Sequence, residues 1–241
     1  MARIDGRAND QLRPVEILPG INRFAEGSCL IRCGNTHVLC TASVEERTPP
    51  HVPEGEGWVT AEYSMLPRAN LERSRRDISK GKLSPRSAEI QRLVGRALRA
   101  AVDLKKLGER TITIDCDVLQ GDGGTRTASV TGGFVALSYA CWKLVEEGAI
   151  PEMPITTCVA AVSAGIVDDV PMLDLCYEED SSAMVDLNCV MNHEGEIIEL
   201  QGTGEGRAFT IAEQRQLVDL CAKGIREIQA IQKAVLEGGD A

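Results

Sequence analysis

Residues 111–142 read TITIDCDVLQGDGGTRTASVTGGFVALSYACW, a strand pattern that passes through a glycine-rich loop into a helix pattern. Polar and apolar residues alternate from Thr111 to Leu119, as in a half-buried β-strand. A helix is predicted from about Thr125 to Glu147. Between Phe134 and Trp142 only Ser138 is polar, so we expect this helix at the centre of the protein.

Further elements are predicted on both sides of this unit. Gly34-Asn35 separates two β-rich runs and predicts a hairpin. Ser84 can cap a helix that begins with Pro85 and ends at Gly108. Gly132-Gly133 predicts close backbone packing, since each glycine in a helix costs on the order of 1 kcal/mol relative to alanine. The other expected elements are strands over 28–33, 36–44, Trp58–Leu66, Cys158–Val167, Met172–Tyr177, Ala183–Met191 and Glu196–Leu200, and a helix from the Thr210/Glu213 capping box to about Leu236.

The order of these elements is strands, helix, strand, helix, strands, helix. The strands before Ser84 and those after Cys158 form two similar groups. We therefore expect an α/β (α+β) fold with mixed sheets packed on helices. Residues 1–241 would form a single domain built of two related βαβ-type halves.

Composition excludes several classes of protein. The chain has 241 residues, 43% hydrophobic and 26% charged, enough to bury a sizeable core. No run approaches the roughly 18–20 apolar residues of a membrane span, and the N-terminus lacks the apolar core of a signal peptide. We therefore expect a cytoplasmic protein with no membrane partner. The nine cysteines include no Cys-x-x-Cys pair, which argues against a disulfide framework or a zinc site.

Charge is distributed unevenly along the chain. The net charge is −10, but residues 68–99 contain ten basic and three acidic residues, so the remainder carries −17. A basic segment in an acidic protein is typical of a polyanion site. A solvated helix face is the alternative interpretation for Arg92, Arg96 and Arg99. The stretch Arg68–Lys82 has few apolar residues and predicts a mobile loop that a partner orders.

The loop Gly121–Thr127 can hold an anion. Backbone N–H groups at a helix N-terminus bind anions, and glycine lets the backbone approach a ligand closely. Arg126 in the first turn opposes the helix dipole unless an anion is bound. A tight turn with an exposed arginine is the alternative. The P-loop signature is absent, and Arg126 stands where a dinucleotide fingerprint needs glycine, so both of those nucleotide-binding classes are disfavoured.

The segment Asp174–Asp186 is rich in carboxylates. Asp186 and Asn188 share one side of an otherwise apolar strand, where a charge is rarely buried without a partner. Hard oxygen ligands of this kind suit Mg²⁺ or Mn²⁺. Asp180 and Asp186 would lie roughly 20 Å apart in one straight strand, so a shared ion requires a bend near Ser181-Ser182. An exposed turn with one hydrogen-bonded aspartate is the alternative.

Several long blocks of this sequence match a known family in their order. They are Gly57–Ala69, Glu89–Arg96, Ile114–Gln120, Asp122–Thr127, Asp174–Asp186 and Gln201–Gly206. With these blocks the chain resembles the ribonuclease PH family, bacterial phosphorolytic 3′-to-5′ exoribonucleases that trim tRNA precursors. The resemblance runs from Arg13-Pro14-Val15 to the last helix. It implies the family's duplicated βαβ-type fold and a ring-shaped homohexamer, a trimer of dimers.

The resemblance also implies roles for individual residues. The family's phosphate site corresponds to Arg86, Gly124, Thr125 and Arg126. Its metal-binding and catalytic acids correspond to Asp180 and Asp186, which would act with Arg126 and Mg²⁺ or Mn²⁺; whether Asp180 is a general acid or only a metal ligand stays open. Its tRNA-contacting arginines correspond to Arg68, Arg73 and Arg76. The chain departs from the family's pattern at Pro85, Ser87 and Gly121, and none of these changes removes a functional side chain.

The implied reaction uses inorganic phosphate as co-substrate and releases nucleoside diphosphates from the 3′ end of tRNA precursors. It is reversible, so nucleoside diphosphates would extend the RNA. The main competing class is a catalytically inactive RNA-binding ring subunit, and retention of the candidate arginines and aspartates argues against it. Two more classes stay open at this point: a hydrolytic metal-dependent nuclease, and an unrelated phosphate-binding enzyme that acts on small metabolites.

Overall fold

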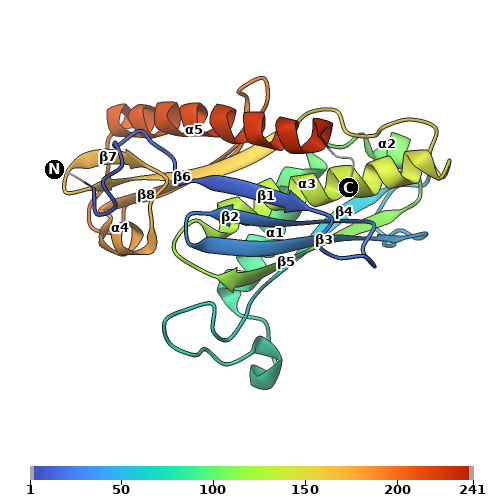
Figure 1. Cartoon of the computed structure of the whole chain (residues 1–241), viewed down its shortest axis with the longest axis horizontal. Coiled ribbons are helices and arrows are strands. Elements are labelled where there is room, and N and C mark those ends of the chain that lie inside the picture. Colours follow the sequence, from blue (N-terminus) through green and yellow to red (C-terminus); the bar gives the residue numbers. More distant parts are fainter. Residues whose placement is uncertain (1–2, 239–241) are drawn as a thin grey trace.

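The computed structural model describes residues 3–238, in which two β-sheets enclose one helix and carry others (Figure 1). The first sheet has the strand order β1-β2-β3-β5-β4 and the second β7-β6-β8-β9. The strands are β1 (Val15–Pro19), β2 (Gly27–Cys33), β3 (Thr36–Glu45), β4 (Trp58–Met65), β5 (Thr111–Gln120), β6 (Val159–Val167), β7 (Val170–Leu173), β8 (Val185–Asn192) and β9 (Ile197–Thr203). The helices are α1 (Pro85–Arg99), α2 (Leu104–Leu107), α3 (Thr125–Glu146), α4 (Tyr177–Ser182), α5 (Ile211–Glu237) and the 3₁₀ helix η1 (Asp77–Lys80).

The first sheet is antiparallel except where β4 runs parallel to β5. That pair is parallel because α1 carries the chain back between the two strands. The predicted hairpin at Gly34-Asn35 is confirmed: β2 and β3 pair in register from Cys33 and Thr36 outward, and Gly34 has φ +55°. The predicted cap of α1 is also confirmed, since Ser84 accepts a hydrogen bond from the N–H of Ser87 (3.0 Å).

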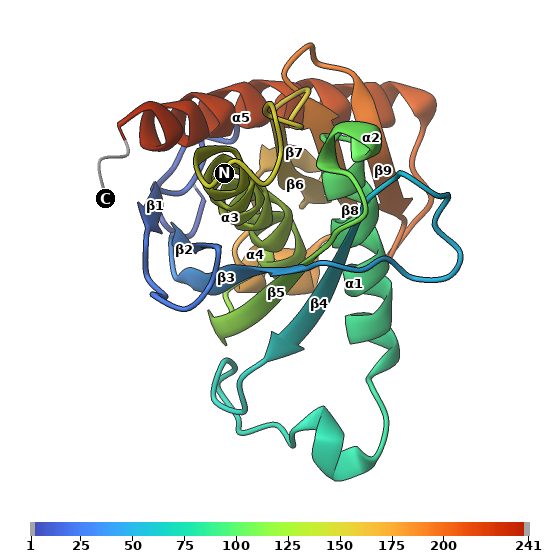
Figure 2. The ribbon, with the colours of Figure 1, turned by 90° about the vertical axis from the view of Figure 1, so that its right-hand side faces the viewer.

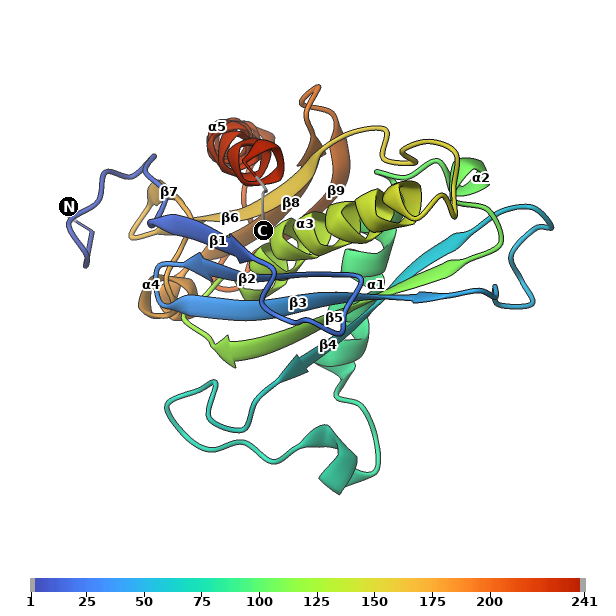
Figure 3. The same cartoon turned by 45° about the vertical axis from the view of Figure 1, so that its right-hand side comes forward.

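Helix α3 lies between the two sheets and packs against β2, β3 and β6 (Figure 3). A Cβ atom on Gly132 would stand 2.8 Å from Ile31 Cγ2 and 2.9 Å from Cys40 Sγ, which confirms the predicted close packing at the glycine pair. Within the described residues, α3 is the helix long and apolar enough to cross a membrane by length and composition, and 78% of its most apolar window is buried inside the protein. Its core position accounts for that composition.

The last helix, α5, covers the second sheet and reaches β1 of the first. Its predicted capping box is confirmed: Glu213 accepts from the N–H of Thr210 (2.7 Å), and Thr210 Oγ1 accepts from the N–H of Glu213 (3.2 Å). The second sheet is antiparallel throughout. Its strand β6 is buried along its whole length, because α3 and α5 both pack on it.

Two predicted elements end well before their expected last residues. The helix after Ser84 ends at Arg99, not Gly108; Val102 forms a β-bridge with Ile155, and the side chain of Asp103 caps the separate helix α2. Ala101 and Val102, which follow α1, are buried without being helical. The strand expected over Met172–Tyr177 ends at Leu173, because Asp174 turns the chain with φ +53°. Strand β1 and helix α4 were not predicted.

The segment between β4 and α1 projects from the body of the protein (Figure 2). Residues 68–82, which we call the basic loop, form most of it. Ala69 is buried, whereas Leu71 is 88% exposed. Asp77 Oδ2 accepts from the N–H of Ser84 (3.1 Å), which ties η1 to the start of α1. The side chains of Ile78 and Lys80 lie outside the described residues.

Candidate active site

A cleft of about 600 Å³ lies where the two sheets meet and brings together most of the candidate residues. The glycine loop, the start of α1, α4 and β8 supply its walls. Its lining contains Arg86, Gly124, Thr125, Arg126, Asp180 and Asp186, together with Asn70, Ser163, Tyr177, Asn188 and Glu205. Residues far apart in the sequence therefore line the same cleft. The predicted tRNA-contacting arginines do not line it.

The glycine loop is fixed from several sides. Gly123 and Gly124 have φ +72° and +67°, and a Cβ atom on Gly123 would stand 2.5 Å from the carbonyl oxygen of Leu175. Only glycine therefore fits at that position. Thr36 Oγ1 accepts from the N–H of Asp122 (2.9 Å) and donates to the Gly123 carbonyl (2.6 Å). Contacts within the protein therefore fix the conformation of this loop where it lines the cleft.

Helix α3 begins in this loop without a side-chain cap, since Gly124 occupies its N-cap position. The N–H groups of its first turn are therefore available to an anion. Thr125 Oγ1 lies 2.9 Å from Tyr63 Oη, which orients the threonine at the helix start. These features favour the anion-site interpretation over a plain turn.

The two candidate arginines approach the same space from different helices. Arg126, 21% exposed, donates to Gln201 Oε1 (3.1 Å) and lies 3.7 Å from a carboxylate oxygen of Glu89. Arg86 is the second residue of α1 and is exposed. Burial raises the pKa of Asp180, and the two guanidinium groups offset part of this increase. Their charge therefore reaches the carboxylate side of the cleft.

Asp180 lies in α4 and Asp186 in β8, and the chain turns between them at Ala183. The bend that a shared site requires is therefore present. Burial raises the pKa of Asp186 to about 6, and the nearby Asp180 carboxylate adds to this effect. Asp186 Oδ2 accepts from Asn188 Nδ2 (3.0 Å), whereas Oδ1 is buried with no hydrogen-bond partner among the described residues. An unpartnered buried carboxylate oxygen facing a cleft marks a place for a ligand.

Ser163 is a cleft residue that sequence reasoning missed. It is the one polar side chain in the otherwise apolar strand β6, and that isolation was the available signal. Its Oγ atom is buried and has no hydrogen-bond partner in the described part of the chain. In the sheet it pairs with Asn188, two strand positions from the Gly165–Asp186 pair and therefore on the same face.

The donors present suit a hard divalent cation held by few protein ligands. In the described part of the chain, no group of three or more His, Cys, Asp or Glu side chains is arranged to hold a metal ion. Mg²⁺ commonly takes one or two carboxylates and completes its shell with water and substrate phosphates. Asp180 and Asp186, with the unpartnered Oδ1, match that pattern.

The basic segment divides into two parts. Arg96 forms a paired contact with Glu199 (2.7 Å and 2.7 Å), and Arg99 donates to the Val59 carbonyl (2.8 Å) and stacks over Trp58. These two arginines serve contacts within the protein. Arg68, Arg73 and Arg76 are exposed in the basic loop.

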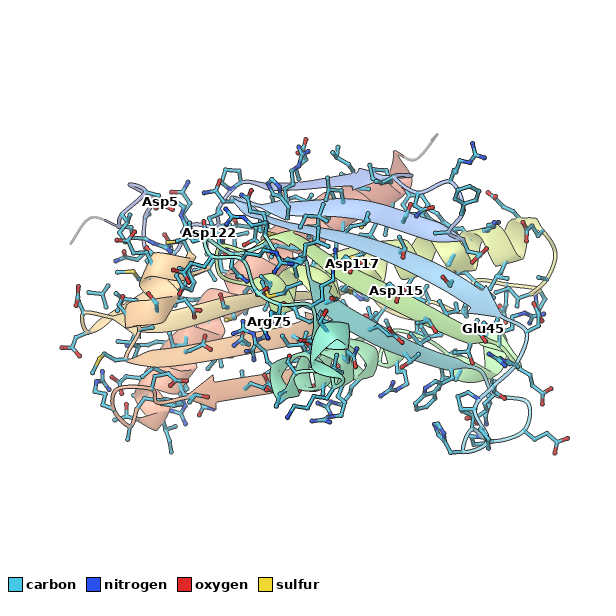
Figure 4. All side chains as sticks on the ribbon, turned by 90° about the horizontal axis from the view of Figure 1, so that it is seen from below. Asp5, Glu45, Arg75, Asp115, Asp117 and Asp122 are labelled. Atoms are coloured by element: carbon cyan, nitrogen blue, oxygen red, sulfur yellow. The ribbon has the colours of Figure 1, made fainter. Side chains whose placement is uncertain are left out.

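The basic loop begins beside the cleft. Asn70 lines the cleft, and the Ala69 carbonyl accepts from the N–H of Gly121 (2.8 Å). The charge of Arg76 opposes the burial that raises the pKa of Asp117 on β5 (Figure 4 labels Asp117 and Arg75, which precedes Arg76 in the chain). An extended polyanion could therefore touch the loop and the cleft together.

Residues 11–142 match the 3′ exoribonuclease family, domain 1, and residues 157–223 match domain 2 of the same family. Ribonuclease PH of Bacillus pumilus is 57% identical over 235 residues, 97% of each chain. Ribonuclease PH of Syntrophomonas wolfei is 54% identical over 237 residues, 98% of this chain and 99% of the relative.

Solved structures agree with these relatives. An Archaeoglobus fulgidus exosome structure with RNA bound to the active site has a TM-score of 0.80 at 25% identity, covering 95% of this chain and 91% of that one. Rice Rrp46 gives 0.80 at 17% identity, covering 97% and 100%, and so supports the fold alone. The cleft takes its arginines from the first matched region and its aspartates from the second. The chain belongs to the 3′ exoribonuclease family.

Proposed function

We propose that this protein is a phosphorolytic 3′-to-5′ exoribonuclease that shortens RNA with inorganic phosphate and releases nucleoside diphosphates. One observation carries the proposal: an uncapped helix N-terminus with two arginines faces a pair of carboxylates across a single cleft. The first group fits phosphate, and the second fits the reacting end of an RNA chain. Ribonuclease PH relatives at 54% and 57% identity support the same activity.

In this reaction Arg86, Arg126 and the first turn of α3 hold inorganic phosphate. Guanidinium forks suit phosphate oxygens because they donate in pairs. A phosphate oxygen forms a bond to the phosphorus of the terminal nucleotide, and the bond from that phosphorus to the preceding 3′-oxygen breaks. The products are a nucleoside diphosphate and an RNA one nucleotide shorter. One phosphorus–oxygen linkage replaces another, so the reaction is readily reversible and nucleoside diphosphates extend the RNA.

The leaving 3′-oxygen needs a proton. Burial raises the pKa of Asp180, which makes protonated carboxyl groups more common there than at a free aspartate. Asp180 can donate this proton or bind a metal ion, as Asp186 can. Mg²⁺ or Mn²⁺ held by these two residues would neutralise charge on the phosphodiester.

The proposed substrates are tRNA precursors with 3′ extensions. The exposed Arg68, Arg73 and Arg76 support this, because the basic loop starts at the cleft and projects beyond it. Aromatic residues make up 3% of the chain, so binding rests on phosphate contacts more than on base stacking.

We further propose that residues 1–241 act as one domain of two related halves, in a cytoplasmic homohexamer arranged as a trimer of dimers. The cleft between the two sheets supports the single-domain part, since each half supplies part of the lining. Sedimentation equilibrium of the purified protein tests the assembly: a hexameric mass is expected.

The test of the activity uses a tRNA with extra 3′ nucleotides and Mg²⁺, with phosphate present or omitted. Nucleoside diphosphates should appear only with phosphate. Monophosphates without phosphate would identify a hydrolase. No product in either case would favour the inactive RNA-binding ring subunit. Arg86→Gln is the matched variant, and it should need more phosphate for half-maximal rate.

A further inference from the structure

The first residues of the described chain lie beside α4 and contact it. Residues 3–13, which we call the N-terminal strap, contain Arg3, Arg7 and Arg13 (Figures 1 and 3 show the blue N-terminal segment beside β7 and α4). The Arg3 side chain is 0% exposed, although it belongs to a terminal segment. A fully buried, paired arginine indicates a specific structural task.

Arg3 forms a two-pronged ion pair with Glu179 of α4. Its Nε and Nη2 atoms lie 2.8 Å and 2.6 Å from the two carboxylate oxygens. The same guanidinium donates to the carbonyls of Leu173 (2.7 Å) and Asp174 (3.1 Å), which lead into α4. Arg3 therefore contacts both the helix and the turn before it. Arg7 adds a contact to the Asp174 carbonyl (3.1 Å), and its Nη2 atom lies 3.7 Å from Glu179 Oε2.

Glu179 has a second task, since it completes the capping box of α4. Its Oε2 atom accepts from the N–H of Cys176 (3.2 Å), while Arg3 binds the same carboxylate. Helix α4 spans six residues, far fewer than an isolated helix needs to be stable in water. Its shape and position therefore depend on such contacts.

Asp180 follows Glu179 directly and faces the cleft. Its N–H donates to the Cys176 carbonyl (2.8 Å), so its place is set by the same helical turn that Glu179 caps. The phosphate-binding candidates lie on other elements, α1 and α3. Helix α4 also touches the glycine loop, since the N–H of Tyr177 donates to Asp122 Oδ1 (3.1 Å). Disturbing α4 should therefore move the carboxylate of Asp180 more than the phosphate-binding arginines.

We propose that Arg3 is a positioning residue, which holds α4 through Glu179 and thereby sets Asp180 for the reaction. This inference rests on the proposed function, because the readout is turnover. Arg3 touches no substrate. A misplacement of a reacting group by about 1 Å can cost on the order of 100-fold in rate, and a loss of about that size in kcat is expected on removing Arg3.

The experiment is a double-mutant cycle with Arg3→Gln, Glu179→Gln and both together. Glutamine at position 179 can still accept the Cys176 N–H, so the cap is retained while the ion pair is removed. The matched control is Lys223→Gln. It removes the exposed contact of Lys223 Nζ with Asp10 Oδ2 (2.6 Å), which ties the same strap to α5 without touching α4.

Three measurements are made on each variant: kcat at saturating RNA and phosphate, the Kd for inorganic phosphate alone, and hydrogen exchange of peptides from α4 and α3. We expect a loss of kcat in both single variants, no further loss in the double variant beyond that of Glu179→Gln, and a loss of phosphate affinity much smaller than the loss of kcat. Exchange should rise in α4 and stay constant in α3. The control should match the wild type.

A folded Arg3→Gln variant with wild-type kcat would overturn the inference, and so would multiplicative losses in the double variant. If Arg3→Gln does not fold, the Glu179→Gln variant decides, because it removes the ion pair and retains the cap; wild-type kcat there would equally overturn it. A wild-type protein without phosphorolysis would instead refute the proposed function. Measuring phosphorolysis by the wild-type protein therefore distinguishes a failure of the proposed function from a failure of this inference.

Discussion

Replacing Arg13 by methionine should destabilise the protein strongly. Arg13 Nη2 and Nε lie 2.7 Å and 3.0 Å from the two carboxylate oxygens of Asp174, and its backbone N–H lies 2.8 Å from one of them. The side chains are 4% and 7% exposed, so water screens this pair little. Removing one partner of a buried pair costs about 3–5 kcal/mol, a large share of the roughly 5–15 kcal/mol of a typical domain.

The same pair predicts how stability depends on pH. Burial raises the pKa of Asp174, but the hydrogen bonds and charge of Arg13 outweigh it, and the pKa lies below its ordinary value of 3.8. A depressed pKa in the folded state contributes stability above the unfolded pKa of about 4, and that stability is lost as pH falls through the folded value. Asp174→Asn should therefore flatten the loss of stability in acid below about pH 4.

Urea unfolding at pH 7, followed by far-ultraviolet circular dichroism, measures the free energy of unfolding. Arg47→Met is the matched control, because its ion pair with Glu45 is 81% and 46% exposed. Exposed pairs contribute about 0–1 kcal/mol. If Arg13→Met costs no more than this control, the buried pair does not stabilise the fold in the way proposed.

Arg126→Lys should weaken phosphate binding by roughly 10- to 100-fold, since it loses a charge-assisted hydrogen bond of about 1.5–3 kcal/mol. Calorimetry with inorganic phosphate measures this affinity. An unchanged affinity would contradict the role of the guanidinium fork. Asp180→Asn should keep phosphate affinity and lose turnover, so a parallel loss of both would place Asp180 in the phosphate site. Gly132→Ala should lower the free energy of unfolding by about 1–3 kcal/mol through overpacking, because the new Cβ would stand 2.8 Å from Ile31 Cγ2. Urea unfolding measures this change, and an unchanged stability would refute the tight contact. Arg73→Ala and Arg76→Ala should each lower the slope of log affinity for tRNA against log salt by about 1, and an unchanged slope would remove them from the RNA surface.

Local patterns predicted the parts of the fold that local forces fix. The Gly34-Asn35 turn, the Ser84 cap and the Thr210/Glu213 box each depend on neighbouring residues, and each is confirmed. The glycine pair in α3 was also informative, because a glycine in a buried helix has few causes other than close packing.

The missed features depend on partners distant in sequence. Helix α4 reads as a polar run, Tyr177–Ser182, and Arg3 holds it from 176 positions away. No local sequence pattern predicts a contact between residues so far apart in the chain. Strand β1 was missed for a similar reason, since its five residues form a strand by pairing with β2 at the sheet edge.

The sequence predicted most residues of the candidate site but not how they are arranged in space. Residue patterns pointed to Arg126, Asp180 and Asp186, and the resemblance to a family added Arg86 and implied the roles of all four. The structure adds that Asp186 Oδ1 and Ser163 Oγ are buried and unpartnered among the described residues. It also shows that Arg3 binds Glu179 of α4 and that Arg13 binds Asp174 and the Asp122 carbonyl of the glycine loop. Their roles in catalysis stay predictions, which turnover and phosphate-binding measurements on the variants test.

Transfer of labelled inorganic phosphate tests the central claim most directly. The protein, Mg²⁺ and a 3′-extended tRNA are incubated with ³²P-phosphate, and the released nucleotides are separated. We expect the label to appear as the β-phosphate of nucleoside diphosphates, and Asp180→Asn to abolish its transfer. Unlabelled nucleoside monophosphates would contradict phosphorolysis, because water rather than the held phosphate would then be the attacking group.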